Sequence, residues 1–72
     1  MRVTLMRTEA LSGRRVEEVA ELADGTLAGE LLDQHGIDSR TCVVVVNGAA
    51  VTRGAALRDG DQVRLYPVQA GG

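Results

Sequence analysis

The sequence predicts an α+β domain in which a sheet of four or five strands packs on one main helix. Apolar and polar residues alternate near both ends of the chain, as they do in strands with one buried face. Between these stretches, residues 27–35 carry leucines at the spacing of an amphipathic helix. One helix covers only one face of such a sheet, so the other face should remain open.

Length and composition limit the kind of protein. The chain has 72 residues, enough for one domain with a small core, and Tyr66 is its only aromatic residue. Valine, leucine and alanine must fill that core, so we expect a modest stability of ~3–5 kcal/mol. The single cysteine, Cys42, excludes an internal disulfide and gives no metal-ligand spacing, so no metal site is expected.

Charge and hydropathy point away from nucleic-acid and membrane partners. The formal net charge is −2, and no basic patch is interleaved with aromatic residues. The longest apolar run, residues 42–46, is far too short to span a membrane. The first residues lack the basic-then-apolar pattern of a signal peptide. We therefore expect a cytoplasmic protein.

The first part of the chain should hold two strands. Residues 1–7 alternate and are predicted as a strand. Residues 15–22 are predicted to return beside them after a turn at Ser12-Gly13, although their valines and alanines fit helical spacing almost equally well. A strand is preferred because residues 1–7 need a pairing partner.

The helix over residues 27–35 has sequence signals at both ends. Thr26 is the expected N-cap, and Gly36 can adopt the left-handed conformation that ends a helix. His35 lies in the last turn. The sequence shows no cysteine, second histidine or carboxylate as its partner, so His35 is interpreted as a surface residue rather than a general base or ligand.

The rest of the chain should add a hairpin and a final strand. Asn47-Gly48 is typical of the tight turn of a hairpin, and Leu57 is expected to reach the core from a loop. Pro67, near the end, is tolerable only where the sheet does not need its missing N–H. The strands predicted here are residues 41–46, 49–51 and 62–67.

Period two sorts the valines of residues 41–46 between the two faces of the sheet. Val44 and Val46 are expected under the helix, and their neighbours on the open face. Open-face valines beside arginines suggest a surface for docking a partner. A small domain can also simply expose a few valines. The candidate docking surface is Val43, Val45, Arg53 and Arg64.

No catalytic motif stands out. The sequence has no Gly-rich phosphate loop, no paired carboxylates and no Ser/His/Asp set. Cys42 would need a histidine or a helix N terminus nearby to act as a nucleophile, and the sequence guarantees neither. Cys42 is therefore interpreted as a small packing residue.

The sequence ends in Gly71-Gly72, which is a poor way to finish a strand because glycine loses the most backbone entropy when ordered. A terminal Gly-Gly is well suited to threading a narrow channel, since no side chain can catch on its walls. It would then deliver its carboxylate to the active site of another protein. The alternative is a frayed terminus.

Several segments together resemble the ubiquitin-like sulfur carriers. This family includes the thiamine-biosynthesis sulfur carrier, the small subunit of molybdopterin synthase and their archaeal protein-modifier relatives. The resemblance covers most of the chain and is strongest over residues 41–72. The segments that carry it are Asp24-Gly25-Thr26-Leu27-x-x-x-Leu31-Leu32, Val43-Val44-Val45-Val46-Asn47-Gly48 followed by Val51, Leu57-x-Asp59-Gly60-Asp61-x-Val63 and Tyr66-Pro67-Val68-x-Ala70-Gly71-Gly72.

The resemblance implies a β-grasp (ubiquitin-like) fold, with a mixed sheet around one helix, and a role as a carrier rather than an enzyme. A separate E1-like enzyme would use ATP to adenylate the Gly72 carboxylate. A persulfide donor would then convert it to a thiocarboxylate. The acceptor would be a synthase such as thiazole synthase or the large subunit of molybdopterin synthase. The carrier itself would bind no cofactor.

The same resemblance implies roles for the C-terminal residues. Residues 1–67 should form the domain, and residues 68–72 should form a flexible tail. Gly72 would carry the chemistry, while Gly71 and Ala70 keep the approach to the active site narrow. The remaining residues expected to thread into or bind a partner are Tyr66, Pro67, Val68 and Gln69.

Two other readings stay open from the sequence. In the first, the chain is a protein modifier whose Gly72 is joined to lysines of other proteins, because the same activated carboxyl serves both purposes. In the second, it is a non-catalytic β-grasp binding module whose Gly-Gly end is incidental.

Overall fold

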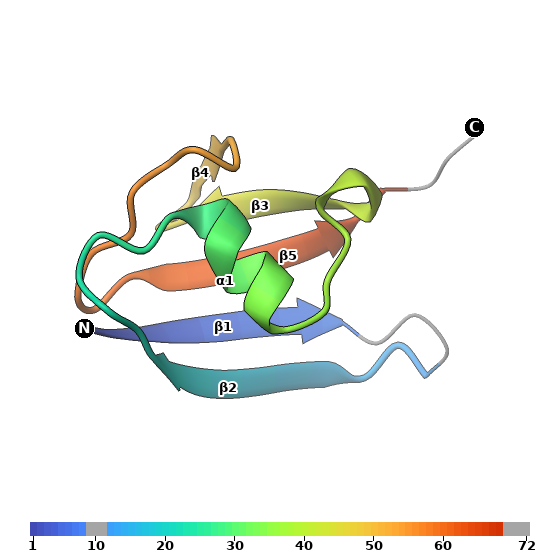
Figure 1. Cartoon of the computed structure of the whole chain (residues 1–72). Coiled ribbons are helices and arrows are strands. Elements are labelled where there is room, and N and C mark those ends of the chain that lie inside the picture. The colour runs from blue at the N-terminus through green and yellow to red at the C-terminus, as the bar shows by residue number, and fades with distance from the viewer. Residues whose placement is uncertain (9–11, 69–72) are drawn as a thin grey trace.

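The computed structural model describes residues 1–8 and 12–68. These residues form a five-stranded sheet, one α-helix and one short 3₁₀ helix (Figure 1). In chain order the elements are β1 (Arg2–Thr8), β2 (Arg15–Glu21), α1 (Ala28–Gln34), η1 (Ser39–Thr41), β3 (Cys42–Val46), β4 (Ala49–Val51) and β5 (Gln62–Pro67).

The sheet is mixed, with strand order β2-β1-β5-β3-β4. The neighbouring strands β1 and β5 run parallel, whereas every other neighbouring pair is antiparallel. Helix α1 lies across one face of the sheet (Figure 1). The predicted α+β architecture, with one helix on a mixed sheet of four or five strands, is confirmed.

The prediction of a strand at residues 15–22 is also confirmed. β2 pairs with β1 along its whole length, from Arg2 opposite Glu21 to Thr8 opposite Arg15. Local spacing did not distinguish strand from helix here. Pairing with the first strand decides the conformation, which is a tertiary effect that overrides local propensity.

The N-cap of helix α1 lies one residue later than predicted. Leu27 is the N-cap, and its N–H donates to the Glu30 side chain at 3.0 Å. The Thr26 hydroxyl turns backwards and donates to the Ala23 carbonyl at 2.7 Å, so the prediction that Thr26 caps the helix is wrong. At the other end, Gly36 has a φ of 67°, the left-handed conformation expected there.

The core lies between α1 and the covered face of the sheet. Its largest fully buried side chains come from β1, β5 and α1, and Leu57 reaches it from the loop before β5, as predicted. Val44 is 5% exposed and Val46 packs against the core, so the predicted facing of these two valines is confirmed. The five most deeply buried large residues are Val3, Leu5, Leu31, Leu32 and Val63.

The described residues contain no helix that is long and apolar enough to cross a membrane.

Leu31→Ala should leave the domain largely unfolded at room temperature. Leu31 is fully buried, and truncating a buried leucine to alanine costs about 2–5 kcal/mol, which is as large as the whole stability expected for this chain. Urea denaturation followed by circular dichroism measures the loss. Val19→Ala is the control: Val19 is 62% exposed, and its truncation should cost less than about 1 kcal/mol. Equal losses in the two variants would contradict this description of the core.

Candidate functional site

The C-terminal end of β5 marks the place from which the chain leaves the sheet. β5 is a central strand and ends at Pro67 (Figure 1). The next residue, Val68, still donates its N–H to the Thr41 carbonyl at 2.9 Å. The predicted threading residues Gln69, Ala70, Gly71 and Gly72 lie outside the described residues.

Pro67 sits where its missing N–H is not needed. The β3–β5 ladder is bracketed by hydrogen bonds from Asn47 to Gln62 and from Val68 to Thr41. In an antiparallel ladder every second residue bonds to its partner strand, so residues 62, 64, 66 and 68 bond to β3 and Pro67 does not. On its other side, pairing with β1 stops at Leu65. A central strand can therefore end in proline here.

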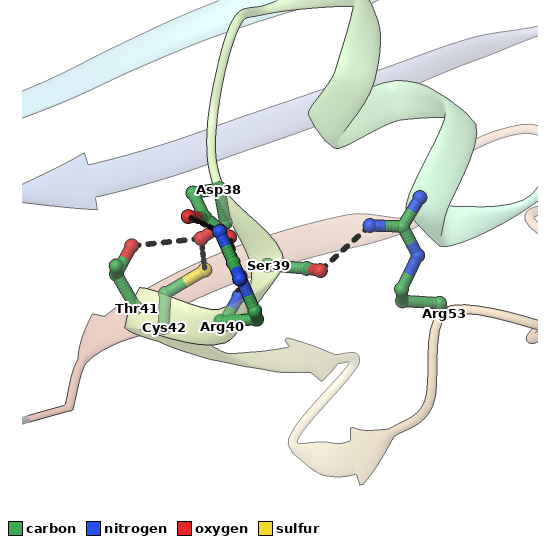
Figure 2. A network of polar contacts seen from close by, with 6 residues as sticks. All are labelled: Asp38, Ser39, Arg40, Thr41, Cys42 and Arg53. Atoms are coloured by element: carbon green, nitrogen blue, oxygen red, sulfur yellow. Dashed lines mark hydrogen bonds and ion pairs between the residues drawn. The ribbon is translucent and has the colours of Figure 1, made fainter.

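The turn at residues 38–41 lies beside this exit and is organised by Asp38 (Figure 2). The Asp38 carbonyl accepts from the Thr41 N–H at 3.0 Å and from the Thr41 hydroxyl at 2.7 Å. Its carboxylate accepts from the Arg40 N–H at 2.9 Å and from the Arg40 guanidinium at 3.0 and 3.2 Å. The Arg40 side chain, and then its backbone N–H, lower the pKa of Asp38. The Asp38 carboxylate therefore stays ionised to a lower pH than an ordinary aspartate does.

Arg53 binds to the helix side of the molecule. Its guanidinium donates to the Ser39 hydroxyl at 2.6 Å (Figure 2). It also donates to the Asp33 carboxylate at 2.9 Å, which links the 38–41 turn to α1. It crosses the helix at Gly29, where an added Cβ would lie 2.8 Å from the Arg53 Nε. The prediction that Arg53 lies beside Val43 and Val45 is therefore wrong. A glycine inside a predicted helix was the one signal of this close approach.

The remaining members of the predicted docking surface do come together on the face opposite α1, which we call the uncovered face. Val43 lies opposite Tyr66 and Val45 opposite Arg64 in adjacent strands, and these alternate with the buried Val44. Val43 is 43% exposed and Tyr66 is 49% exposed. Tyr66, which the sequence analysis assigned to the exit of the chain, thus lies on the same face as Val43 and Val45.

The uncovered face is hollowed on both sides of Arg64 and Tyr66. One hollow, of about 220 Å³, reaches across β5 and β1 to β2, and the other, of about 430 Å³, reaches to β3 and its hairpin turn. Such shallow hollows suit the side chains of a protein partner. Met6 and Arg15 line the first hollow and were not predicted, although the alternation of residues 1–7 already places Met6 on this face.

His35 has a partner that the sequence did not reveal. It is half-buried, its Nδ1 donates to the Leu31 carbonyl at 3.0 Å, and its Nε2 lies 3.8 Å from Glu18 on β2. Glu18 also accepts from Arg7 on β1 at 3.3 Å. His35 thus places the end of α1 beside β2, next to a residue, Glu18, that is distant from it in the sequence.

Cys42 is not an activated thiol. Its Sγ faces the Asp38 carbonyl at 3.8 Å, and burial, helped by the Asp38 charge, raises its pKa. A raised pKa lowers the thiolate fraction, and the thiolate is the nucleophile. Within residues 1–8 and 12–68, no three His, Cys, Asp or Glu side chains come together to hold a metal.

The sequence profile of the ThiS family matches residues 7–72. The chain belongs to the ThiS family. The resemblance to the ubiquitin-like sulfur carriers is therefore confirmed, and with it a place among small carrier or modifier proteins, which are generally not catalysts.

Solved structures with the same fold agree with membership of the ThiS family. SAMP1 from Haloferax volcanii is 23% identical with a TM-score of 0.72, and the match covers 100% of both chains. A ubiquitin-like protein from Caldiarchaeum subterraneum is 18% identical with a TM-score of 0.62, over 99% of this chain and 100% of that one. In a complex of subunits 1 and 2 of the molybdopterin-converting factor from Helicobacter pylori, the matching chain is 18% identical with a TM-score of 0.62, over 100% of both. The predicted β-grasp fold is confirmed.

The folded protein should react slowly with iodoacetamide near neutral pH. Because the pKa of Cys42 is raised, the folded chain holds less thiolate than the urea-unfolded chain and should be alkylated more slowly at the same pH. The rate should climb as the pH rises into the alkaline range. Mass spectrometry of timed samples measures it. Faster alkylation of the folded state would show an activated thiol and would contradict the interpretation of Cys42 as a packing residue.

Proposed function

We propose that this ThiS-family chain is a cytoplasmic sulfur carrier that works through the carboxylate of Gly72. A separate ATP-dependent, E1-like enzyme activates that carboxylate, and a persulfide donor supplies the sulfur. The observation that carries the proposal is the match to the ThiS family, which extends through the Gly71-Gly72 end of the sequence. The position of β5 supports it, because the chain leaves the sheet at the end of its middle strand, which is flanked on both sides.

The carbon of the Gly72 carboxylate is a poor electrophile, so the carboxylate must first be activated. One of its oxygens attacks the α-phosphate of ATP, which gives an acyl-adenylate and releases pyrophosphate. The terminal sulfur of a persulfide then attacks the acyl carbon and displaces AMP, which leaves an acyl disulfide. A second thiol reduces that acyl disulfide. The thiocarboxylate is released and stays on Gly72, while the donor's sulfur and the second thiol become joined in a disulfide. The thiocarboxylate is a nucleophile that a sulfur-accepting synthase can use.

None of these steps requires a side chain of the carrier. ATP is a co-substrate of the activating enzyme, so the carrier binds no cofactor of its own. The distance also fits: residues 69–72 beyond the anchored Val68 can span about 13–14 Å when fully extended. That length lets the carboxylate enter a recessed active site while the folded domain stays outside.

The uncovered face is the proposed docking surface for these partners. Val43, Val45, Arg64 and Tyr66 combine apolar area with a cation beside an aromatic ring, a composition favoured at interfaces. The H. pylori protein of the same fold was solved as a complex of two subunits, which supports a synthase subunit among the partners. Arg53 is not part of this surface, because Asp33 and Ser39 bind it on the helix side.

Conjugation to other proteins is the alternative function. The structural likeness to SAMP1 and to a ubiquitin-like protein keeps it open, and the same acyl-adenylate would serve an attacking lysine amine. The chain has no lysine, so it could supply the carboxyl end of an isopeptide bond but no side-chain amine to receive one.

Mass spectrometry of the protein purified from its native host tests the proposal. A carrier should show the mass gain of one oxygen replaced by sulfur, and C-terminal fragments should place that gain on Gly72. Fragmentation is essential because oxidation of Met1, Met6 or Cys42 adds a nearly equal mass. Conjugates that carry this chain on lysines would favour the modifier. An unmodified mass, with no charging by ATP and the cognate activating enzyme, would leave only a binding module.

Gly71→Val and Gly72→Val should abolish adenylation while the fold stays intact. A β-branched side chain widens the segment that must thread the channel and restricts its backbone. ATP–pyrophosphate exchange with the activating enzyme measures the reaction, and circular dichroism checks the fold. Val19→Ala, on the edge strand, is the matched control and should be charged normally. Normal charging of the two glycine variants would show that the threading argument is wrong.

Val43→Glu should raise the KM of the activating enzyme for the carrier about tenfold or more, because it buries an unpaired charge at the centre of the docking surface. Val19→Glu places the same change on a more exposed valine of the edge strand β2, at the far side of the same face, and should change KM far less. Equal effects of the two substitutions, or no effect of either, would remove Val43 and its neighbours on β3 and β5 from the proposal.

A further inference from the structure

Among the described residues, the backbone hydrogen bond nearest the C terminus runs from the Val68 N–H to the Thr41 carbonyl. Thr41 is the last residue of η1 and precedes β3. The exit of the chain is therefore attached to a turn rather than to a strand. Whatever fixes that turn also fixes where the residues after Val68 begin.

Asp38 fixes the turn through two of its groups, its backbone carbonyl and its side-chain carboxylate. Its carbonyl accepts from the Thr41 N–H and hydroxyl, which sets the orientation of the Thr41 peptide. Its carboxylate accepts from the Arg40 N–H, and the Arg40 guanidinium contacts both carboxylate oxygens (Figure 2). A two-point contact of this kind restricts direction as well as distance. All these partners lie within three residues of Asp38, so little chain entropy opposes them.

The turn is also fastened to the rest of the domain. Ser39 accepts from Arg53 (Figure 2), and the Arg53 guanidinium also donates to Asp33 on α1. On the other side, Cys42 faces Pro67 at the end of the β3–β5 ladder. The 38–41 turn thus connects the helix layer to the last residues of β5.

We propose that Asp38 is a positioning residue for activation: its carboxylate caps the 38–41 turn whose Thr41 carbonyl anchors Val68, and so sets the point and direction from which the chain leaves the sheet. The consequence for activation rests on the function proposed above. Without the anchor, Val68 gains conformational freedom that is lost each time the carboxylate enters a partner's active site. The carboxylate then reaches the reactive geometry less often.

Hydrogen exchange of the Val68 amide tests the anchor without any partner. In Asp38→Ala, exchange should be about fivefold faster relative to the amides of β1, a typical loss for a capping side chain. The matched control is Asp61→Ala. Asp61 accepts from Arg58 and Asn47 at the opposite end of β5, so its loss should change the exchange of Val68 and of β1 alike, through the stability of the whole domain. Unchanged relative exchange of Val68 in Asp38→Ala would overturn the proposal.

Steady-state adenylation tests the consequence. Asp38→Ala should lower kcat severalfold at nearly constant KM, because the docking surface on the uncovered face is untouched. Asp38→Asn keeps the acceptor for the Arg40 N–H and should restore most of the activity. If Asp61→Ala lowers kcat as much as Asp38→Ala, the role of Asp38 is only structural and the proposal is wrong. If the wild-type chain is not adenylated at all, the proposed function fails, whereas the Val68 exchange still decides the anchor.

Discussion

The parallel pairing of β1 with β5 is the contact on which the rest of the structure depends. It joins the two ends of the chain at the centre of the sheet, from Thr4 opposite Gln62 to Arg7 opposite Leu65. The inward residues of these strands form the floor of the core beneath α1. Because β5 is flanked on both sides, the exit of the chain emerges from the best-supported strand of the domain rather than from an edge.

This arrangement separates recognition from chemistry. In the function proposed above, the uncovered face would offer shape and charge to a partner, while the described side chains supply neither an activated thiol nor a metal site. A carrier that worked in this way could change partners by altering face residues such as Val43 or Tyr66 without disturbing a catalytic arrangement. The uncovered face and the exit of the chain are adjacent, because Tyr66 lies on the face and the next residue, Pro67, lies at the exit.

Much of the fold could be predicted from the sequence, because alternation and turn residues are local signals. The alternation of residues 41–46 correctly assigned Val44 to the core, and the Asn47-Gly48 turn gave the hairpin. Two errors arose where the deciding contact is distant along the chain: Arg53 crosses α1 at Gly29, and His35 meets Glu18 on β2. The third is local, because the Thr26 hydroxyl bonds back to the Ala23 carbonyl instead of capping the helix. No local pattern encodes which surface a long side chain will cross.

The aromatic composition of the chain has a practical consequence. Tyr66 is the only tyrosine, and the chain has no tryptophan or phenylalanine. This single ring sits half-exposed on the uncovered face, outside the aliphatic core. Its fluorescence and near-ultraviolet dichroism therefore come from one defined place beside the exit of the chain. In this protein the natural optical signal reports on the surroundings of one side chain of the uncovered face, whereas the aliphatic core gives no fluorescence or near-ultraviolet dichroism of its own.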